Sequence, residues 1–301
     1  ISIFNEDATP QASHNFNNNS IIAVCNGEEF LKKYRAGSTM SAEISKDKDI
    51  QLLPLHACAI SLIEEGIQMF SFASSSAESF IPVETEYIGK NKDPISTIQS
   101  LTHPDIMLQR IPIFTDVDEL TIGIGDNKHI HLEDDYIHMD ISPLNLINNI
   151  NAEKNVNINK IMRLVEPLWE SRVVSVEVSS KEFFSALSRA ASVKSDGLTL
   201  EITDTEILMK SMNVDGRIPF HQTIECSTQW HDDDAHKYII NINISSIRKI
   251  SSMVSSLPSI SFDVSTYEVT SSSIPAVIVI KIDEEYDNND PHDFFVIPTI
   301  R

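Results

Sequence analysis

Histidine and aspartate residues gather at two places where they could bind a metal ion. His231 and His236 flank three consecutive aspartates and an alanine, and His129 and His131 are separated by one residue. Imidazole and carboxylate ligands together suit zinc or manganese. A strand would put His129 and His131 on one face, but Ile130 between them is the apolar residue, so we expect both histidines to point to solvent. The aspartate run follows a polar stretch, as a loop insertion would. We therefore predict no metal site, and a metal-dependent enzyme is only a lesser alternative.

The sequence has no motif of a phosphate-binding or hydrolytic enzyme. It contains no Gly-rich phosphate loop and no GxSxG elbow, and only 8 of its 301 residues are glycine. Its three cysteines, Cys25, Cys58 and Cys226, are far apart and odd in number. This spacing fits neither a disulfide framework nor a zinc site with paired cysteines. We expect reduced thiols in an intracellular protein that is not an enzyme and uses no cofactor.

The charge of the chain bears on its partners. A formal net charge of −21 argues at first sight against nucleic acid, because an acidic surface repels phosphates. The positions of the few cations must therefore decide. No apolar run approaches the roughly 20 residues that span a bilayer, and the N-terminal residues lack the basic and apolar regions of a signal peptide. We expect no membrane partner and a cytoplasmic location.

Cations gather on the polar faces of three predicted helices. In the helices 180–193 and 245–257, apolar residues fall on one face and serines and cations on the other, which we expect to hold no acid. The helix 27–36 is also basic, although Glu28 and Glu29 dilute its charge. The cations on these helices are Lys32, Lys33, Arg35, Lys181, Arg189, Arg248 and Lys249.

These basic, serine-rich faces favour a surface that binds a polyanion. Small serine side chains would let a phosphate backbone approach without base-specific contacts. Any solvated helix has a polar face with a lysine or two, and for one helix that simpler interpretation is preferable. Three helices with the same bias, at equivalent places of a repeated unit, favour the polyanion surface.

The hydrophobic periodicity predicts an α+β protein. In the first half, helical patterns occupy 27–36 and 94–101, the segment Gly125–Asn127 is a turn, and strand alternation occupies 21–24, 59–63, 67–72, 81–87, 120–124 and 130–141. In the second half, helices occupy 180–193 and 245–257, a polar loop follows residue 212, and strands occupy 174–178, 198–202, 207–212, 238–242, 260–264, 276–282 and 294–297.

The second half repeats the plan of the first, and is itself a doubled unit of a strand, a helix and further strands. We predict a flexible leader at 1–20, an N-terminal domain at 21–145, a connector at 146–171 and a C-terminal domain at 172–301.

Four stretches of the second half resemble, in order and spacing, the last domain of the bacterial DNA sliding clamp, the beta subunit of the replicative polymerase. Residues 180–193 are similar to its first helix, with the pattern LxxAxxRAxxx, and 197–211 to the hairpin that follows. The other two stretches are 238–250 and 295–301. In the first half, residues 119–132 resemble a late hairpin of a middle clamp domain.

The resemblance implies the DNA-clamp fold: a closed ring of six domains, with helices inside that face double-stranded DNA and antiparallel sheets outside. Such a ring tethers a DNA polymerase, and binds it and the clamp loader through short peptides. The chain has room for two domains, as in proliferating cell nuclear antigen, so a homotrimer is favoured over a dimer. A domain lost before Ile1 would favour a dimer. The expected location is the nucleoid or a viral replication site.

The resemblance also implies a partner-peptide pocket at the C-terminal end of the chain. Thr299 stands where a methionine is usual, and Ile300-Arg301 where Arg-Leu is usual, which would alter partner specificity. The alternative for this tail is a last core strand, and both interpretations can hold. A clamp-fold scaffold that does not encircle DNA is the alternative function. The implied pocket residues are Pro167, Arg172, Val173, Phe295, Val296, Ile297, Pro298, Thr299 and Ile300.

Overall fold

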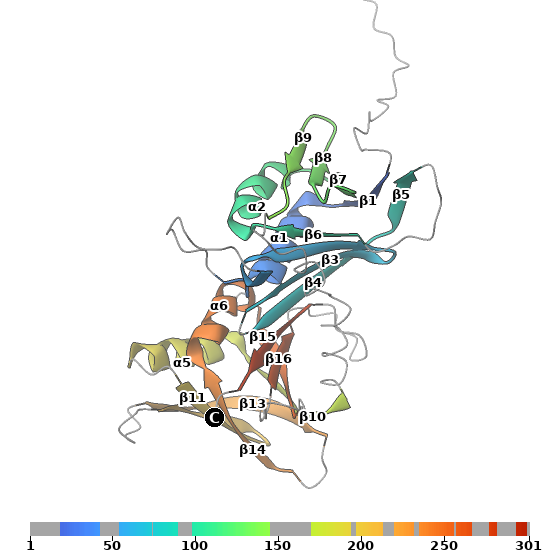
Figure 1. Cartoon of the computed structure of the whole chain (residues 1–301). Helices are drawn as coiled ribbons and strands as arrows, with labels where there is room; N and C mark the ends of the chain where they lie inside the picture. The colour runs from blue at the N-terminus through green and yellow to red at the C-terminus, as the bar shows by residue number, and fades with distance from the viewer. Residues whose placement is uncertain are drawn as a thin grey trace, which may run out of the picture. The chain divides into compact units, whose positions relative to one another are not determined.

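The computed structural model (Figure 1) describes residues 19–42, 54–73, 75–89, 98–144, 170–193, 197–212, 220–231, 235–255, 257–266, 277–281 and 293–299. The contacts between Cα atoms divide the chain into two units. Unit 1 consists of Ile1–Lys32, Ala59–Gln68 and Ile81–Pro143, and unit 2 of Lys33–Cys58, Met69–Phe80 and Leu144–Arg301.

The described elements of the first half begin with a strand and a helix. Their bounds are β1 (Asn19–Cys25), α1 (Gly27–Ser38), the 3-10 helix η1 (Pro54–His56), β2 (Cys58–Ile63), β3 (Gly66–Phe72), β4 (Ser76–Pro82), β5 (Thr85–Gly89), β6 (Ile98–Thr102), α2 (Pro104–Arg110), the 3-10 helix η2 (Ile111–Phe114), β7 (Leu120–Gly125), β8 (Ile130–Glu133) and β9 (His138–Ile141). The boundary between the units passes through α1, β2, β3 and β4.

The described elements of the second half follow the same plan. Their bounds are β10 (Arg172–Ser179), α5 (Ser180–Ser192), β11 (Gly197–Thr203), β12 (Glu206–Met212), β13 (His221–Trp230), β14 (Lys237–Asn243), α6 (Ile244–Val254), β15 (Ser259–Ser265), β16 (Val277–Lys281) and β17 (Phe294–Pro298). The predicted α+β class is confirmed.

The order of the strands repeats between the halves. One sheet has the order β5-β1-β7-β8-β9, and the other has β14-β11-β12-β13-β10-β15-β16-β17-β4-β3-β2-β6. The run β13-β10-β15-β16-β17 therefore repeats β5-β1-β7-β8-β9, and β14-β11-β12-β13 repeats β6-β2-β3-β4. The long strand β13 pairs with both β12 and β10. It therefore occupies the positions that the two strands β4 and β5 occupy in the first half. The predicted internal repetition is confirmed at the level of topology.

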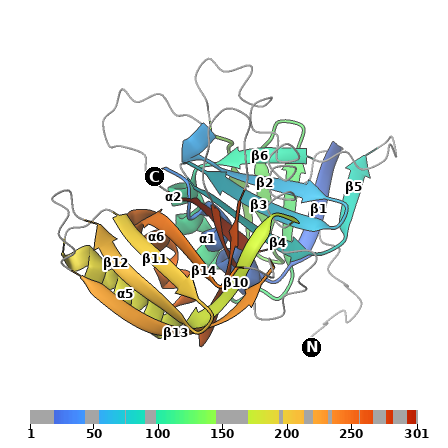
Figure 2. The same cartoon turned by 90° about the horizontal axis from the view of Figure 1, so that it is seen from below.

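Capping residues and amphipathic patterns position the helices of unit 2. The Ser179 side chain accepts a hydrogen bond from the Glu182 backbone N–H at 3.4 Å, at the start of α5. The Asn243 side chain accepts from the Ser245 N–H at 2.9 Å, at the start of α6. Each bond satisfies one of the free N–H groups of a helix N-terminus. The two helices lie side by side against the sheet strands (Figures 1 and 2).

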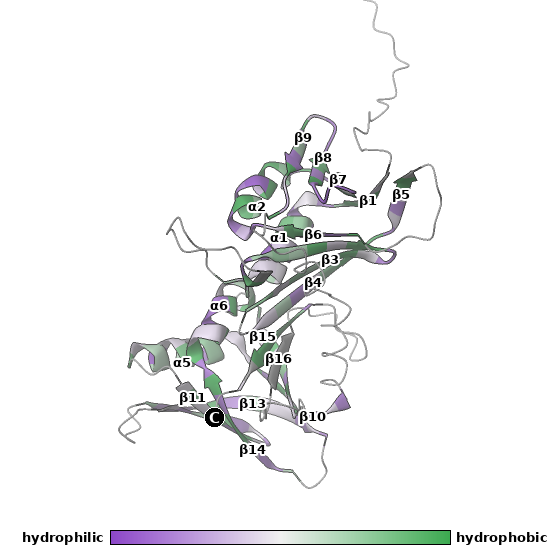
Figure 3. Cartoon of the chain, in the orientation of Figure 1, coloured by the Kyte–Doolittle hydropathy of each residue, from purple (hydrophilic) through white to green (hydrophobic). Residues whose placement is uncertain are grey.

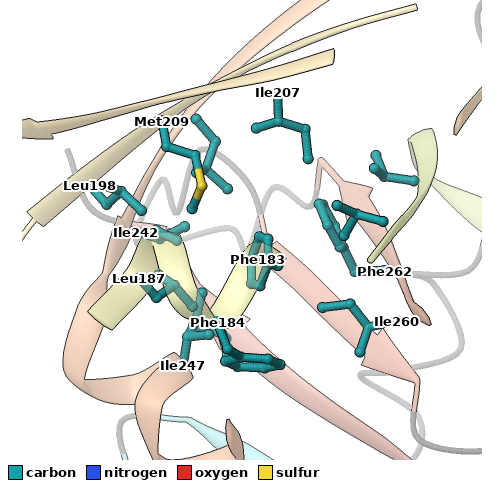
Figure 4. Close-up of a cluster of buried hydrophobic side chains, with 14 of the residues drawn as sticks. Phe183, Phe184, Leu187, Leu198, Ile207, Met209, Ile242, Ile247, Ile260 and Phe262 are labelled. Atoms are coloured by element: carbon teal, nitrogen blue, oxygen red, sulfur yellow. The ribbon is translucent and has the colours of Figure 1, made fainter. Parts of the chain in front are cut away.

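Buried apolar side chains from helices and strands form the core of unit 2. Phe183 and Phe184 on α5 meet edge to face, with ring centroids 5.5 Å apart, and Phe262 on β15 lies 5.9 Å from Phe183. Figure 4 shows these rings among side chains of α6, β11, β12 and β14. Burying each large apolar side chain stabilises the fold by about 1.5–3 kcal/mol.

Four sequence-based expectations about elements are wrong. Residues 98–101 of the expected helix 94–101 belong to the strand β6, and the helix α2 begins at Pro104. The expected strand 81–87 is split into β4 and β5, and the expected strand 130–141 into β8 and β9. The polar segment after β12 contains β13. Only Ile224 of β13 is buried, so its sequence carries almost no apolar signal.

Other expectations lie outside the described residues. They include the leader up to residue 18, the connector residues 146–169 with Pro167, and Ile300. In the described part of the chain, no helix is long and apolar enough to cross a membrane.

Candidate functional site

The structure places most of the predicted cations on exposed helix surface. Lys181 and Arg189 are exposed on α5, and Arg248 and Lys249 are exposed on α6. Lys32 and Arg35 are likewise exposed on α1. The predicted exposure of these six side chains is confirmed.

Lys33 differs from the other cations. Its ammonium group forms an ion pair with Asp293, and the side chains are only 14% and 5% exposed. The second oxygen of Asp293 accepts a hydrogen bond from the Phe80 N–H at 2.8 Å. The expectation that Lys33 faces DNA is therefore corrected, because its charge is used in an internal ion pair.

The acids on the helices also differ from the expectation. α5 has an exposed acid, Glu182, in its first turn. The prediction that its polar face holds no acid is therefore wrong. Glu182 is the third residue after the N-cap Ser179, where a negative charge interacts favourably with the N-terminal end of the helix dipole. Arg189 Nη1 donates to Gln222 Oε1 at 3.1 Å. The sequence of α6 contains no acid, and the residues around Arg248 and Lys249 on its surface are serines, as expected.

The sequence-based search missed a fourth helix with an exposed cation. Arg110 is exposed in the last turn of α2. In the repeated topology α2 follows β6 as α6 follows β14, so the two helices are equivalent. Pro104 at the first helical position was the signal that could have located this helix.

Acidic side chains also gather in loops and strand ends of unit 1, next to the start of α1, where the Gly27 N–H donates to the Val117 carbonyl at 2.9 Å. They line a cavity of about 760 Å³ together with Val24 and Tyr136. The acids of this cavity are Asp116, Asp118, Glu119, Glu133, Asp134 and Asp135. The strongly negative net charge is thus spread unevenly over the described residues.

Three residues of the expected peptide pocket are not surface. Phe295, Ile297 and Thr299 are buried, and the first two belong to the core of unit 2. β17 pairs with β16 on one side and with β4 on the other. The core-strand interpretation of the tail is therefore confirmed, and Phe295, Ile297 and Thr299 are corrected from pocket-lining to buried positions.

The remaining pocket residues are only partly described. Val173, Val296 and Arg172 are half-buried. Arg172 lines a polar cavity of about 350 Å³ over β10, β13 and β15, which contains no residue of β17. Its Nη1 lies 3.9 Å from Asp263 Oδ2. Pro167, Ile300 and the side chain of Pro298 lie outside the described positions.

The β8–β9 hairpin brings two histidines and an aspartate together. His131 is 6% exposed, so the expectation that it points to solvent is wrong. Its Nδ1 forms a hydrogen bond with Asp140 Oδ1, and His138 Nε2 lies 2.9 Å from the same oxygen. Burial raises the pKa of Asp140, but hydrogen bonds and charge from the two histidines outweigh it and leave this pKa below its usual value. His129, the predicted companion of His131, is not part of this cluster.

The repeated topology, with two helices per repeat and antiparallel sheets, is the DNA-clamp fold. Solved sliding clamps have the same fold over nearly the whole chain. The DNA polymerase sliding clamp of Pseudomonas aeruginosa matches with a TM-score of 0.66 at 12% identity, covering 95% of this chain and 68% of the clamp. The DNA polymerase III beta subunit of Thermotoga maritima matches with a TM-score of 0.61 at 15% identity, covering 93% of this chain and 65% of the subunit.

A P. aeruginosa sliding clamp bound to griselimycin also matches, with a TM-score of 0.67 at 12% identity, over 95% of this chain and 67% of the clamp. No protein-family model and no curated protein matches the sequence. The chain thus spans about two thirds of the length of the clamps it resembles. The expected clamp fold is confirmed, and the likeness concerns the fold alone.

Proposed function

We propose that this protein is a non-enzymatic DNA sliding clamp, which encircles double-stranded DNA without sequence specificity and tethers a DNA polymerase. The observation that carries the proposal is the pairing of β17 with β4, in which Phe294, Phe295 and Val296 lie opposite Glu78, Ala77 and Ser76. In the repeated strand order, β17 corresponds to β9, and β4 corresponds to the part of β13 that pairs with β12. The join therefore links the last strand of one repeat to a different strand of the other.

The equivalent strands, β9 and β13, are available for the same join between two chains. β9 is at the end of its sheet and pairs only with β8 among the described residues. Residues 221–225 of β13 pair with β12, and in the described structure they have no other strand beside them. An unpaired strand edge is a template for another chain. Pairing β9 of one chain with β13 of the next is a head-to-tail contact, which builds a ring when the rotation closes.

The number of repeats suggests the stoichiometry. A ring of six repeats needs three chains with two repeats each, so we propose a homotrimer rather than a dimer. The matched share of the bacterial clamps, 68% and 65%, agrees with two repeats. We also propose that the domains extend over 21–145 and 172–301, joined by the connector 146–171. A longer native chain with a third repeat would instead form a dimer.

The DNA-facing surface is proposed to consist of the exposed cations on the helices. Lys33 is left out of this set because Asp293 neutralises it. Charged side chains that contact phosphates without reading bases give affinity that depends on salt and not on sequence. The proposed residues are Lys32, Arg35, Arg110, Lys181, Arg189, Arg248 and Lys249.

The partner site is proposed to bind short peptides of the polymerase and of the clamp loader. Burial of β17 restricts its described contribution to the half-buried Val296, whereas Arg172 and Val173 lie on β10, which β15 and β16 separate from β17 in the sheet. Deleting 296–301 would remove much of a core strand, so a deletion cannot separate binding from folding. Titration with griselimycin, with Val296→Asp as the variant, tests this site without removing the strand. Binding that is unaffected by Val296→Asp would place the site elsewhere.

The decisive experiment combines light scattering with retention on DNA. Size-exclusion chromatography with light scattering should give three chains per particle. The loaded protein should stay on nicked circular DNA and slide off linear DNA with free ends. A monomer without topological preference would support the clamp-fold scaffold instead. Catalytic turnover of a substrate would support the alternative that the protein is an enzyme.

A further inference from the structure

One face of the β8–β9 hairpin carries four titratable side chains in a square. His131 is opposite Asp140, and Glu133 is opposite His138. Residues two apart on a strand share a face, so these four side chains project from the same side of the hairpin. The opposite face carries apolar residues, including Ile130, which pack into the core. Figure 3 shows hydrophilic and hydrophobic residues mixed along β8 and β9.

The register brings the four side chains unusually close. The Asp134 N–H donates to the Ile137 carbonyl at 3.0 Å, where the hairpin closes. Hydrogen-bonded and non-hydrogen-bonded pairs alternate from there, so both cross-strand pairs of the square are non-hydrogen-bonded pairs, in which side chains approach most closely. The rings of His131 and His138 stack diagonally, with centroids 6.0 Å apart.

Two glycines of the neighbouring strand β7 lie near the buried imidazole. Gly123 lies directly opposite His131. A Cβ added at Gly125 would lie 3.6 Å from His131 Nε2 and 3.4 Å from Ser20 Oγ. The Nδ1 of the His131 ring is directed at Asp140.

Three ligand atoms converge on one point of this face. One oxygen, Asp140 Oδ1, contacts the Nδ1 of His131 and the Nε2 of His138. The ligand atoms of the three residues all lie within 4.8 Å of one another. Glu133 Oε2 lies 3.3 Å from the other nitrogen of His138. A carboxylate behind a ligating histidine fixes the tautomer and the ring orientation at metal centres.

We propose that His131 Nδ1, His138 Nε2 and the Asp140 carboxylate bind one divalent transition-metal ion of the zinc class, with Glu133 as the positioning residue behind His138. Two imidazoles and one carboxylate suit zinc and its neighbours, whereas magnesium and calcium prefer sites made of oxygen alone. Three protein ligands leave a position for water, which is exposed here because Asp140 is 54% and His138 30% exposed. The ligands come from one hairpin, but His138 and Asp140 lie on β9, the strand proposed to join the next chain. The mass of each variant, measured by light scattering, therefore separates loss of the metal site from loss of the ring.

The test is metal binding by the full chain after treatment with a chelator. Isothermal titration with Zn²⁺ should show one ion per chain, and Mg²⁺ should show none. Co²⁺ should bind with a visible absorption band that Zn²⁺ displaces. His138→Ala and Asp140→Asn, at exposed positions, should weaken Zn²⁺ binding by about 10-fold or more while leaving the circular dichroism unchanged. Zn²⁺ should raise the Tm of the wild type and not of His138→Ala.

Two histidine variants serve as matched controls. His129→Ala removes the histidine two residues before His131, and His236→Ala removes an exposed histidine 3.5 Å from a single aspartate, Asp204. Both should bind Zn²⁺ like the wild type. Binding that survives His138→Ala but is lost in a control variant would overturn the proposal, as would the absence of stoichiometric Zn²⁺ or Co²⁺ binding.

Discussion

Lys33 on α1 forms an ion pair with Asp293, the residue directly before β17. Both side chains are nearly withdrawn from solvent, and Asp293 also accepts the Phe80 N–H. The pair therefore ties a helix, the edge of β4 and the start of the last strand together within unit 2.

Loss of the Asp293 carboxylate should destabilise the fold. Asp293→Ala leaves the Lys33 ammonium and the Phe80 N–H without this acceptor in a mostly buried place, so we expect the free energy of unfolding to fall by about 2–4 kcal/mol. Urea unfolding, followed by fluorescence, measures this free energy of unfolding. The matched control is Asp105→Ala, which removes an exposed carboxylate in the first turn of α2 and should lower stability by no more than about 1 kcal/mol. Equal effects of the two changes would contradict the role of the ion pair.

Removal of exposed helix cations should weaken retention on DNA without affecting the fold. Arg248→Gln and Lys249→Gln each remove one phosphate contact in the proposed interface. Each should lower the slope of log affinity against log salt by about 0.9. The control is Lys237→Gln, which makes the same change in charge on the strand β14, beside Glu201. If Lys237→Gln lowers the slope as much, the helices are not the DNA surface.

A proline at one position of β13 should prevent assembly of the proposed ring without unfolding the single chain. The Ser211 N–H donates to the Phe220 carbonyl at 3.1 Å. Because the pattern alternates along this register, Gln222 bonds to β12 and the N–H of Thr223 points to the open edge. Thr223→Pro should give a folded monomer, because proline removes an N–H needed only for pairing between chains.

The same experiment has a control one residue away. Gln222→Pro removes a hydrogen bond to β12 and should lower the Tm, whereas Thr223→Pro should leave it nearly unchanged. Light scattering measures the mass of each variant, and circular dichroism its melting. A trimeric Thr223→Pro variant would show that β13 is not the ring interface.

The cysteines should be poorly reactive in the folded protein. Burial raises the pKa of Cys25 and Cys58 to about 12, and that of Cys226 to about 11, with the nearby Glu206 adding to the last shift. Below these values the thiol form dominates, and the thiolate is the reactive species. Iodoacetamide labelling at pH 8, read by mass spectrometry, should therefore be slow. Labelling should become fast in urea, and in the native protein Cys226 should react first as pH rises. Fast native labelling at pH 8 would contradict these shifts.

Apolar alternation made most of this fold predictable. The strands β10 and β11 bury every second residue over most of their length, and the helices α5 and α6 bury one continuous face. Both periods can be read directly from the sequence. The repeat followed from the order of these elements, and so did the fold class.

The missed features depend on contacts distant in sequence. β13 is polar along most of its length because solvent lies beside it, so its strand character comes from the pairing with β12 and β10. His131 is buried opposite Gly123, which lies on another strand. The ion pair of Lys33 joins residues 260 positions apart. No local pattern encodes such partners.

The join of β17 to β4 connects two unlike strands. A contact between unlike edges has a direction, in contrast to a contact related by a two-fold axis. If successive chains join in the same sense, the two rims of the assembly are chemically different and cannot be exchanged by turning it over. A protein bound at one rim would then always meet the same helix ends and hairpins, and threading onto a duplex would fix which way that protein faces along the DNA.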